Sequence, residues 1–142
     1  MPQINQAGVE LIQNFEGCRL RAYDDGTGVW TIGWGHTPAT PGETVTQAQA
    51  DQMLLDDLQR FEQGVNDRVS HSINPNQFAA LVSLTYNVGL EGCPVMFQLV
   101  NGYEYELAQQ HFSAYVYAGG QVLGGLVRRR AAEAALFGKP IE

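Results

Sequence analysis

The sequence has few cysteines, few basic residues and no long apolar run. Its 142 residues include two cysteines, 8 Lys plus Arg and 15 Asp plus Glu, so the net charge is −7. This deficit of positive charge argues against a nucleic-acid partner, whose phosphates must be neutralised, and against stable association with anionic membranes. No apolar stretch approaches the roughly 20 residues of a membrane span. The first residues also lack the basic and apolar regions of a signal peptide, so we expect synthesis in the cytoplasm.

The two cysteines argue against a metal centre. Cys18 and Cys93 lie far apart, and neither belongs to a Cys-x-x-Cys pair or a histidine cluster, so we expect no metal and no cofactor. In a reducing compartment both would be free thiols. The alternative is a disulfide that restrains the chain two residues after Glu16.

What the sequence does contain is the composition of one folded domain. Apolar residues make up 44% and charged residues 16% of the chain, which is enough to bury a core. Helical spacing and capping signals predict helices over residues 5–16, 46–69, 74–86, 94–99, 103–117 and 126–137. Glycines alternate with aromatic residues over 17–36, which is typical of a β-hairpin with tight turns.

The segment from residue 16 to residue 36 carries the candidate chemistry. Glu16 closes an apolar helical face, where apolar neighbours would disfavour its ionised form and suit it to donate a proton. The alternative is an exposed glutamate at a helix end. Asp24 and Asp25 precede glycines and could both be turn residues, and the residues alone do not choose between them.

For each of the other polar residues near this segment, a functional and a purely structural interpretation are both open. Thr31 could orient a water or be a plain strand residue, and His36 could support the site or be structural. Arg128, Arg129 and Arg130 could pair with an active-site carboxylate or form a solvated face. Phosphate-loop and Gly-x-Ser-x-Gly motifs are both missing from the sequence.

Taken together, these residues resemble the bacteriophage-type lysozymes, the endolysins of glycoside hydrolase family 24. The resemblance covers nearly the whole chain and rests on three motifs. They are Phe15-Glu16-Gly17…Tyr23-x-Asp25…Thr31-Ile32-Gly33-x-Gly35-His36, Gln77-Phe78-x-Ala80-Leu81-Val82…Tyr86-Asn87-Val88-Gly89, and Ala118-Gly119-Gly120…Gly124-Gly125-Leu126-Val127-Arg128-Arg129-Arg130-x-x-Glu133.

The resemblance implies hydrolysis of the β-1,4 bond between N-acetylmuramic acid and N-acetylglucosamine in peptidoglycan, and hence lysis of the bacterial wall. Glu16 would be the general acid, Asp25 the second carboxylate and Thr31 the residue beside the attacking water. This leaves Asp24 to the turn, and the water-positioning threonine favours an inverting reaction. Supporting residues would be His36 and one of Arg128 or Arg129, while Thr37 and Tyr86 would contact substrate.

The fold implied is α+β and mostly helical, with two lobes. A three-stranded antiparallel sheet would lie in the N-terminal lobe, followed by a long connecting helix and a helical C-terminal lobe. Within a single domain, residues 1–142, the hairpin lobe would take 14–45, the connecting helix 46–64, and the helical lobe 1–13 with 65–142. We expect a monomer that reaches the wall with the help of a membrane pore, a holin. The rival interpretations are a catalytically weak glycan-binding or virion structural domain, and a secreted antibacterial effector with the same chemistry.

Overall fold

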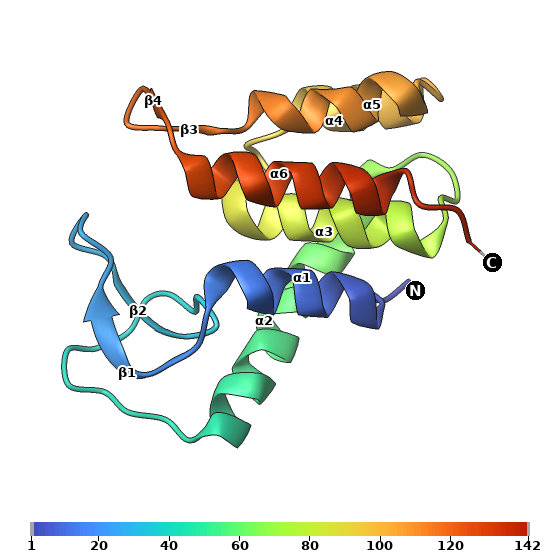
Figure 1. Cartoon of the computed structure of the whole chain (residues 1–142). Coiled ribbons are helices and arrows are strands. Elements are labelled where there is room, and N and C mark those ends of the chain that lie inside the picture. Colours follow the sequence, from blue (N-terminus) through green and yellow to red (C-terminus); the bar gives the residue numbers. More distant parts are fainter. Residues whose placement is uncertain (1, 142) are drawn as a thin grey trace.

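The computed structural model describes residues 2–141, which are mostly helical (Figure 1). The helices are α1 (Gln6–Glu16), α2 (Gln47–Arg68), α3 (Pro75–Val88), α4 (Pro94–Asn101), α5 (Tyr105–His111), the short 3₁₀ helix η1 (Phe112–Ala114) and α6 (Gly124–Phe137). The strands are β1 (Arg19–Asp24), β2 (Trp30–Gly33), β3 (Tyr117–Ala118) and β4 (Gln121–Val122). Helix α3 packs against α1, α2 and α6, and α2 leads from the β1–β2 hairpin to these helices. The mostly helical α+β class is thereby confirmed.

Three of the helices begin where the capping signals predict. The Asn5 side chain accepts a hydrogen bond from the backbone N–H of Gly8 at the start of α1. Complete capping boxes open α2 at Thr46 and α3 at Asn74, because each side chain satisfies an amide that has no partner inside the helix. These starts depend on a few adjacent residues, which is why the sequence alone locates them.

The sheet beside α2 is smaller than expected. Strands β1 and β2 pair antiparallel, with Tyr23 opposite Thr31 and Asp24 opposite Trp30. The expected third strand is reduced to a single bridge between Arg21 and Thr44, flanked by backbone hydrogen bonds on either side. Only a few residues separate the Pro41 turn from Thr46, which already caps α2, so the third strand has no room to extend.

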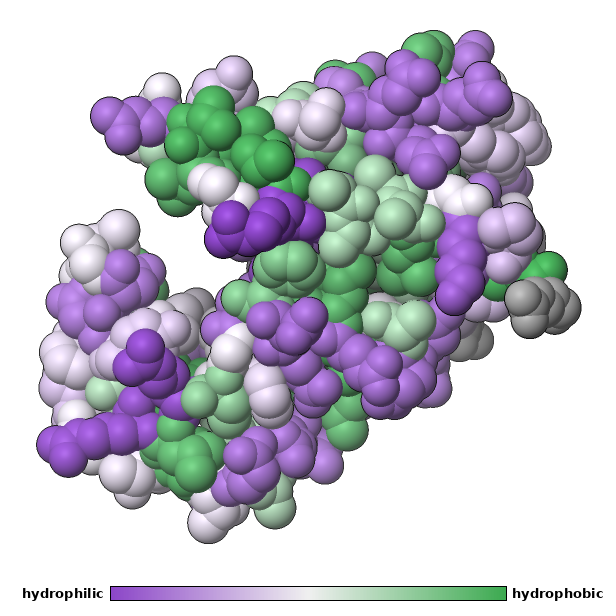
Figure 2. Space-filling model, in the orientation of Figure 1, coloured by the Kyte–Doolittle hydropathy of each residue, from purple (hydrophilic) through white to green (hydrophobic). Residues whose placement is uncertain are grey.

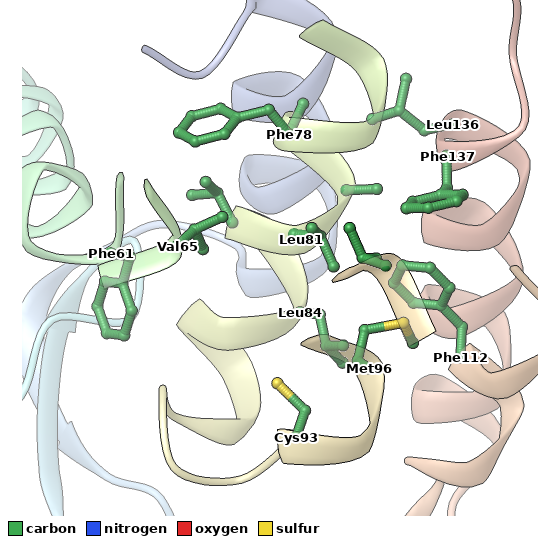
Figure 3. Packing of buried hydrophobic residues seen from close by; sticks show 14 of the residues in the cluster. Phe61, Val65, Phe78, Leu81, Leu84, Cys93, Met96, Phe112, Leu136 and Phe137 are labelled. Carbon is green, nitrogen blue, oxygen red and sulfur yellow. The ribbon is translucent and has the colours of Figure 1, made fainter. Parts of the chain in front are cut away.

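The hydrophobic core surrounds α3 (Figure 3). Leu81 and Leu84 on this helix have no exposed surface, and aromatic rings from three elements close around them. Phe112 and Phe137 meet edge to face with their centroids 5.7 Å apart. Full burial of side chains of this size stabilises the fold by roughly 1.5–3 kcal/mol each. The core thus fixes α1 and α6 on either side of α3, and these two helices carry the site described below.

Several helix boundaries differ from the expectation, as two of the expected helices show. The helix expected over residues 103–117 is only α5 and η1, because Tyr103 has a left-handed backbone (φ +61°) and β3 begins at Tyr117. Helix α6 begins at Gly124 rather than Leu126. The β3–β4 hairpin, which turns through Gly119 and Gly120 at positive φ, begins at Tyr117, the last residue of the expected helix.

The two cysteines are free thiols, so the alternative of a disulfide is wrong. Cys93 lies in the core near Met96 (Figure 3), and burial raises the pKa of its thiol to about 11. Cys18 is partly exposed between α1 and β1, and its sulfur accepts a long hydrogen bond from Gln47. Within residues 2–141, no helix combines the length and apolar character needed to cross a bilayer.

Candidate active site

The carboxylate of Glu16 lies at the end of α1 and faces a guanidinium. Its Oε2 accepts a hydrogen bond of 2.6 Å from Nη1 of Arg129 on α6, and 20% of its side chain is exposed. The carboxylate is thus paired with a cation that the apolar pattern of α1 did not predict, while Phe15, Leu123 and Leu126 line a pocket together with Glu16. Gly17 ends α1 with a backbone φ of +69°, a conformation that glycine adopts without strain.

The turn after β2 packs tightly against the same carboxylate. A Cβ atom placed on Gly35 would lie 2.6 Å from Oε1 of Glu16, and the backbone of Gly35 has a φ of +94°. Both the close approach and the positive φ require glycine here. Glu16 is thus held between α6 on one side and the hairpin on the other.

Arg129 is itself held by a buried network. Its Nε donates to Oε2 of Glu133 at 3.2 Å and its Nη2 donates to the backbone oxygen of Ser83 at 3.1 Å. The Ser83 hydroxyl donates to the same carboxylate oxygen at 2.5 Å. Only 4% of the Arg129 side chain and none of the Glu133 side chain is exposed. Buried charges of this kind persist only when paired and hydrogen-bonded.

The second buried arginine balances the network. Arg130 donates to Oε1 of Glu133 at 2.5 Å and to the backbone oxygen of Tyr115 at 2.9 Å, and it also bonds the side chain of Asn87. Two carboxylates, of Glu16 and Glu133, thereby face two guanidiniums. Arg128, in contrast, is exposed, so among the three arginines it is Arg129 that reaches Glu16.

Asp24 is the last residue of β1, and Asp25 follows it in the exposed turn to β2. Asp24 accepts hydrogen bonds from the amides of Gly26 and Gly28. Asp25 accepts from the hydroxyl of Thr27 at 2.6 Å and from the amide of Thr27 at 2.9 Å. These bonds, above all the one from the hydroxyl, hold the pKa of Asp25 below its usual value. Asp25 is therefore an ionised acceptor over the whole neutral and mildly acidic range.

Thr31 lies in strand β2, and His36 follows the turn after that strand. Thr31 is buried, and its hydroxyl makes a long contact of 3.4 Å to the backbone oxygen of Val29. His36 Nδ1 lies 2.7 Å from Oδ2 of Asp57 on α2, and its backbone pairs with Ile32. His36 thus connects the hairpin turn to α2.

Tyr86 links α3 to the same turn. Its hydroxyl donates to the backbone oxygen of Trp34 at 2.9 Å, and its ring meets Phe61 edge to face at 5.3 Å. Burial, followed by the negative charge of Glu16, raises the pKa of Tyr86 above its usual value, so the hydroxyl stays a donor. Thr37 is exposed just beyond His36.

A cleft opens on one side of the molecule (Figure 2), and Glu16 and Arg129 line it. The space-filling view shows a notch between the β1–β2 hairpin and the surface over β3, β4 and the start of α6. A pocket of about 540 Å³ opens on its helical side, and its lining includes Glu16, Asn87, Leu126, Arg128 and Arg129. A larger open pocket of about 640 Å³ lies along α1 but contains neither Glu16 nor Asp25, so the smaller pocket is the one relevant to the chemistry.

The side chains of Glu16, Asp25 and Thr31 are of the kinds that acid–base chemistry uses. Among residues 2–141, no three His, Cys, Asp or Glu side chains gather as metal ligands would. The available groups are a partly buried carboxyl held by a cation, an exposed carboxylate and a buried hydroxyl on β2. Two carboxyl groups in different environments are what glycosidic bond cleavage requires.

Three contacts that shape this site were not predicted from the sequence. The ion pairs of Glu133 could have been predicted, because it stands four residues after Arg129 and three after Arg130, the spacings at which helical side chains pair. The pairing of Asp57 with His36 and the packing of Gly35 against Glu16 join residues that are distant in the sequence. No local pattern reveals them.

The chain belongs to the phage lysozyme family, which it matches over residues 13–133. It is 43% identical to the endolysin of Bacillus phage PZA over 95% of this chain and 55% of that protein, and 43% identical to the endolysin of Lactococcus phage c2 over 98% of this chain and 62% of that protein. The muramidase domain of SpmX from Asticcacaulis excentricus has a TM-score of 0.90 and 39% identity, covering 99% of this chain and 100% of that chain. The chain spans little more than half the length of the two endolysins, and the resemblance inferred from the motifs is confirmed.

Proposed function

We propose that this protein is a muramidase, which hydrolyses the β-1,4 bond between N-acetylmuramic acid and N-acetylglucosamine in peptidoglycan. The observation that carries the proposal is the placement of Glu16, whose carboxyl is held by Arg129 at the wall of the cleft. Asp25 supplies a second carboxylate, from the hairpin, with a lowered pKa. Membership of the phage lysozyme family supports the same reaction.

In this mechanism Glu16 donates its proton to the glycosidic oxygen as the bond from that oxygen to the anomeric carbon breaks. A water adds to the anomeric carbon and gives its proton to Asp25, and Thr31 orients that water. The ion pair with Arg129 stabilises the Glu16 anion that proton donation leaves. While Glu16 is protonated, Glu133 still compensates the charge of Arg129.

The remaining site residues have supporting roles in the proposal. His36 fixes the hairpin turn through Asp57, and Arg129 positions Glu16. Arg128, which lines the pocket, contacts the substrate rather than the acid. Thr37 and Tyr86 contact the glycan, although the Tyr86 hydroxyl is already engaged by Trp34.

The proposal is tested by digesting purified sacculi and weighing the fragments by mass spectrometry. Hydrolysis predicts fragments with a free reducing N-acetylmuramic acid, each one water heavier than an anhydro product. Anhydro ends would make the protein a lytic transglycosylase. Binding to sacculi with no fragments released would favour the alternative of a glycan-binding or virion structural domain.

We also propose the biological setting of phage lysis, in which the protein acts as a monomer and reaches the wall through a holin. The endolysin relatives support this setting. Expression with and without a pore-forming partner tests it, since lysis should depend on the pore. Lysis that begins without the pore would contradict the dependence.

A further inference from the structure

A second cluster of polar and aromatic side chains lies away from the cleft. It joins the loop between α2 and α3 to the turn between α4 and α5, at the end of the molecule opposite the β1–β2 hairpin (Figure 1). The ring of His71 stacks on Tyr103 with centroids 4.1 Å apart and planes 19° apart. His71 Nε2 lies 2.7 Å from the hydroxyl of Tyr105. We call Ser70, His71, Asn101, Tyr103 and Tyr105 the distal cluster.

Tyr103, in this cluster, combines high exposure with an unusual backbone conformation. Tyr103 is 66% exposed, the largest exposed fraction among the big apolar side chains. It is also the one residue other than glycine with a positive φ, +61°, in the part of the chain that the structure describes. An aromatic side chain is disfavoured in this backbone region, and such strain recurs at ligand-binding positions.

The surroundings hold this ring in place. The Asn101 side chain accepts from the amide and hydroxyl of Ser70 and donates to the backbone oxygen of Arg68. Tyr105 meets the core ring of Phe137 edge to face at 6.4 Å. The two loops are therefore tied together, and one face of Tyr103 rests on His71 while the side chain remains largely open to solvent.

A pocket of about 350 Å³ adjoins the cluster and shares Ser70 and His71 with it. Its other lining residues are uncharged and mix hydrogen-bonding groups with apolar ones: Pro2, Asn66, Val69, Ser72, Ile73 and Phe78. Amide and hydroxyl groups suit the hydroxyls and acetamide of an amino sugar, and the aromatic and aliphatic surfaces suit the C–H face of its ring. The cleft, in contrast, is lined by Glu16, Arg128 and Arg129.

We propose that the distal cluster and its pocket form an accessory binding site for N-acetylhexosamine units of a glycan strand. The inference rests on the proposed action on peptidoglycan and deepens it. A net charge of −7 gives no long-range attraction to an anionic wall, so retention there depends on short-range contacts. A second contact with the same polymer raises the effective concentration of the cleft at its substrate.

The test uses Tyr103→Gly, which removes the ring and fits the positive φ. Its matched control is Leu107→Ala on α5, which removes an exposed apolar side chain, 50% exposed, outside the cluster. Each variant is made in the Glu16→Gln background, and binding is measured by sedimentation with purified sacculi. We expect Tyr103→Gly to weaken binding roughly three- to tenfold, the loss typical of one aromatic contact, and Leu107→Ala to leave it unchanged.

A second measurement locates the contact. Chitotriose added to the ¹⁵N-labelled Glu16→Gln protein should shift the amides of residues 70–73 and 101–105 in addition to amides at the cleft. With an intact Glu16, Tyr103→Gly should cleave short soluble glycan fragments at the wild-type rate but act more slowly on sacculi.

Equal sedimentation of Tyr103→Gly and its background would overturn the inference, as would chitotriose shifts confined to the cleft. A dimer that dissociates on Tyr103→Gly would assign the cluster to a second copy of the chain and also overturn it. Sacculi left intact by the wild type, with sedimentation still dependent on Tyr103, would overturn the proposed hydrolysis and support the accessory site.

Discussion

The two candidate catalytic carboxylates, of Glu16 and Asp25, are held in opposite ways. Glu16 lies on the helical side, where Arg129 fixes it and the buried Glu133 fixes Arg129 in turn. Asp25 lies on an exposed turn and is held by Thr27, two residues away. One position depends on residues more than 100 apart in the sequence, and the other depends on its immediate neighbours.

The two environments have different effects on the two carboxyl groups. The buried network can hold a carboxyl in one place while its charge changes, because a compensating carboxylate stays beside Arg129. The exposed turn keeps Asp25 ionised through hydrogen bonds that favour its charged form. Substitutions of the buried residues that hold Glu16 should therefore affect folding and activity together, whereas those on the turn should affect mainly the pH dependence.

The largest effect is expected from Glu133→Gln. Removing this charge leaves two buried guanidiniums facing one carboxylate, so we expect a loss of about 3–5 kcal/mol in the free energy of unfolding. The matched control is Glu91→Gln, which breaks a surface pair with Arg68 in which the glutamate side chain is 92% exposed and should cost about 0–1 kcal/mol. Urea denaturation measures both, and similar losses for the two variants would contradict the importance of the buried network.

Gly35→Ala should show whether the position of Glu16 affects activity independently of backbone strain. The added methyl group would collide with the Glu16 carboxylate, and a displacement of about 1 Å costs on the order of 100-fold in rate. Gly42→Ala is the control, since Gly42 has a similar φ of +86° but nothing within 4 Å of the added atom. Both variants should lose stability, and only Gly35→Ala should lose activity. An active Gly35→Ala enzyme would show that the turn does not position the acid.

Thr27→Val should change the acid side of the rate profile. The Thr27 hydroxyl is the main cause of the lowered pKa of Asp25, so its loss raises that pKa toward the ordinary value. Asp25 must be ionised to act as a base, and activity will then begin to fall at a higher pH as the solution is acidified. Profiles of kcat/KM against pH measure the shift, with Thr40→Val as the control. An unchanged acid limb would remove Asp25 as the group that titrates there.

The smallest effect is expected from ionic strength. A protein of net charge −7 is repelled by an anionic wall at long range, and salt screens this repulsion over about 10 Å at 0.1 M. The rate of lysis should therefore rise as salt is increased from low to moderate concentration. Turbidity clearing measures the rate, and a steady fall from the lowest salt would show that local attraction dominates.

The same contrast explains how much the sequence could predict. Helix starts at Asn5, Thr46 and Asn74 follow from adjacent residues and are confirmed. The bounds of the helix expected over 103–117 are wrong, because Tyr103 adopts a left-handed backbone and Tyr117 pairs with Val122 in the β3–β4 hairpin. Capping signals thus predict helix starts more reliably than apolar spacing predicts how far a helix extends.

For the site too, features set by neighbouring residues could be predicted, whereas features set by helix packing could not. The sequence predicted Glu16 at a helix end and Asp25 in a turn, as the structure has them, whereas Asp24 is the last residue of β1. It could not choose among three consecutive arginines, because that choice depends on how α6 is rotated against α1 and α3. The pairing of Glu16 with Arg129 was missed for the same reason, since the helical face of α1 does not show which side chains α6 places beside it.

The central claim is that Glu16, held by Arg129, is the proton donor. The most direct test is the rate of reducing-end release from purified sacculi by Glu16→Gln, compared with the wild type at equal folded fraction. Glutamine can still accept the Arg129 hydrogen bond but has no acidic proton to give, so we expect native folding and a rate lower by about 10²–10⁴-fold. Asp24→Asn, altered in the turn beside Asp25, should retain activity. A Glu16→Gln protein that releases reducing ends at the wild-type rate would contradict the account.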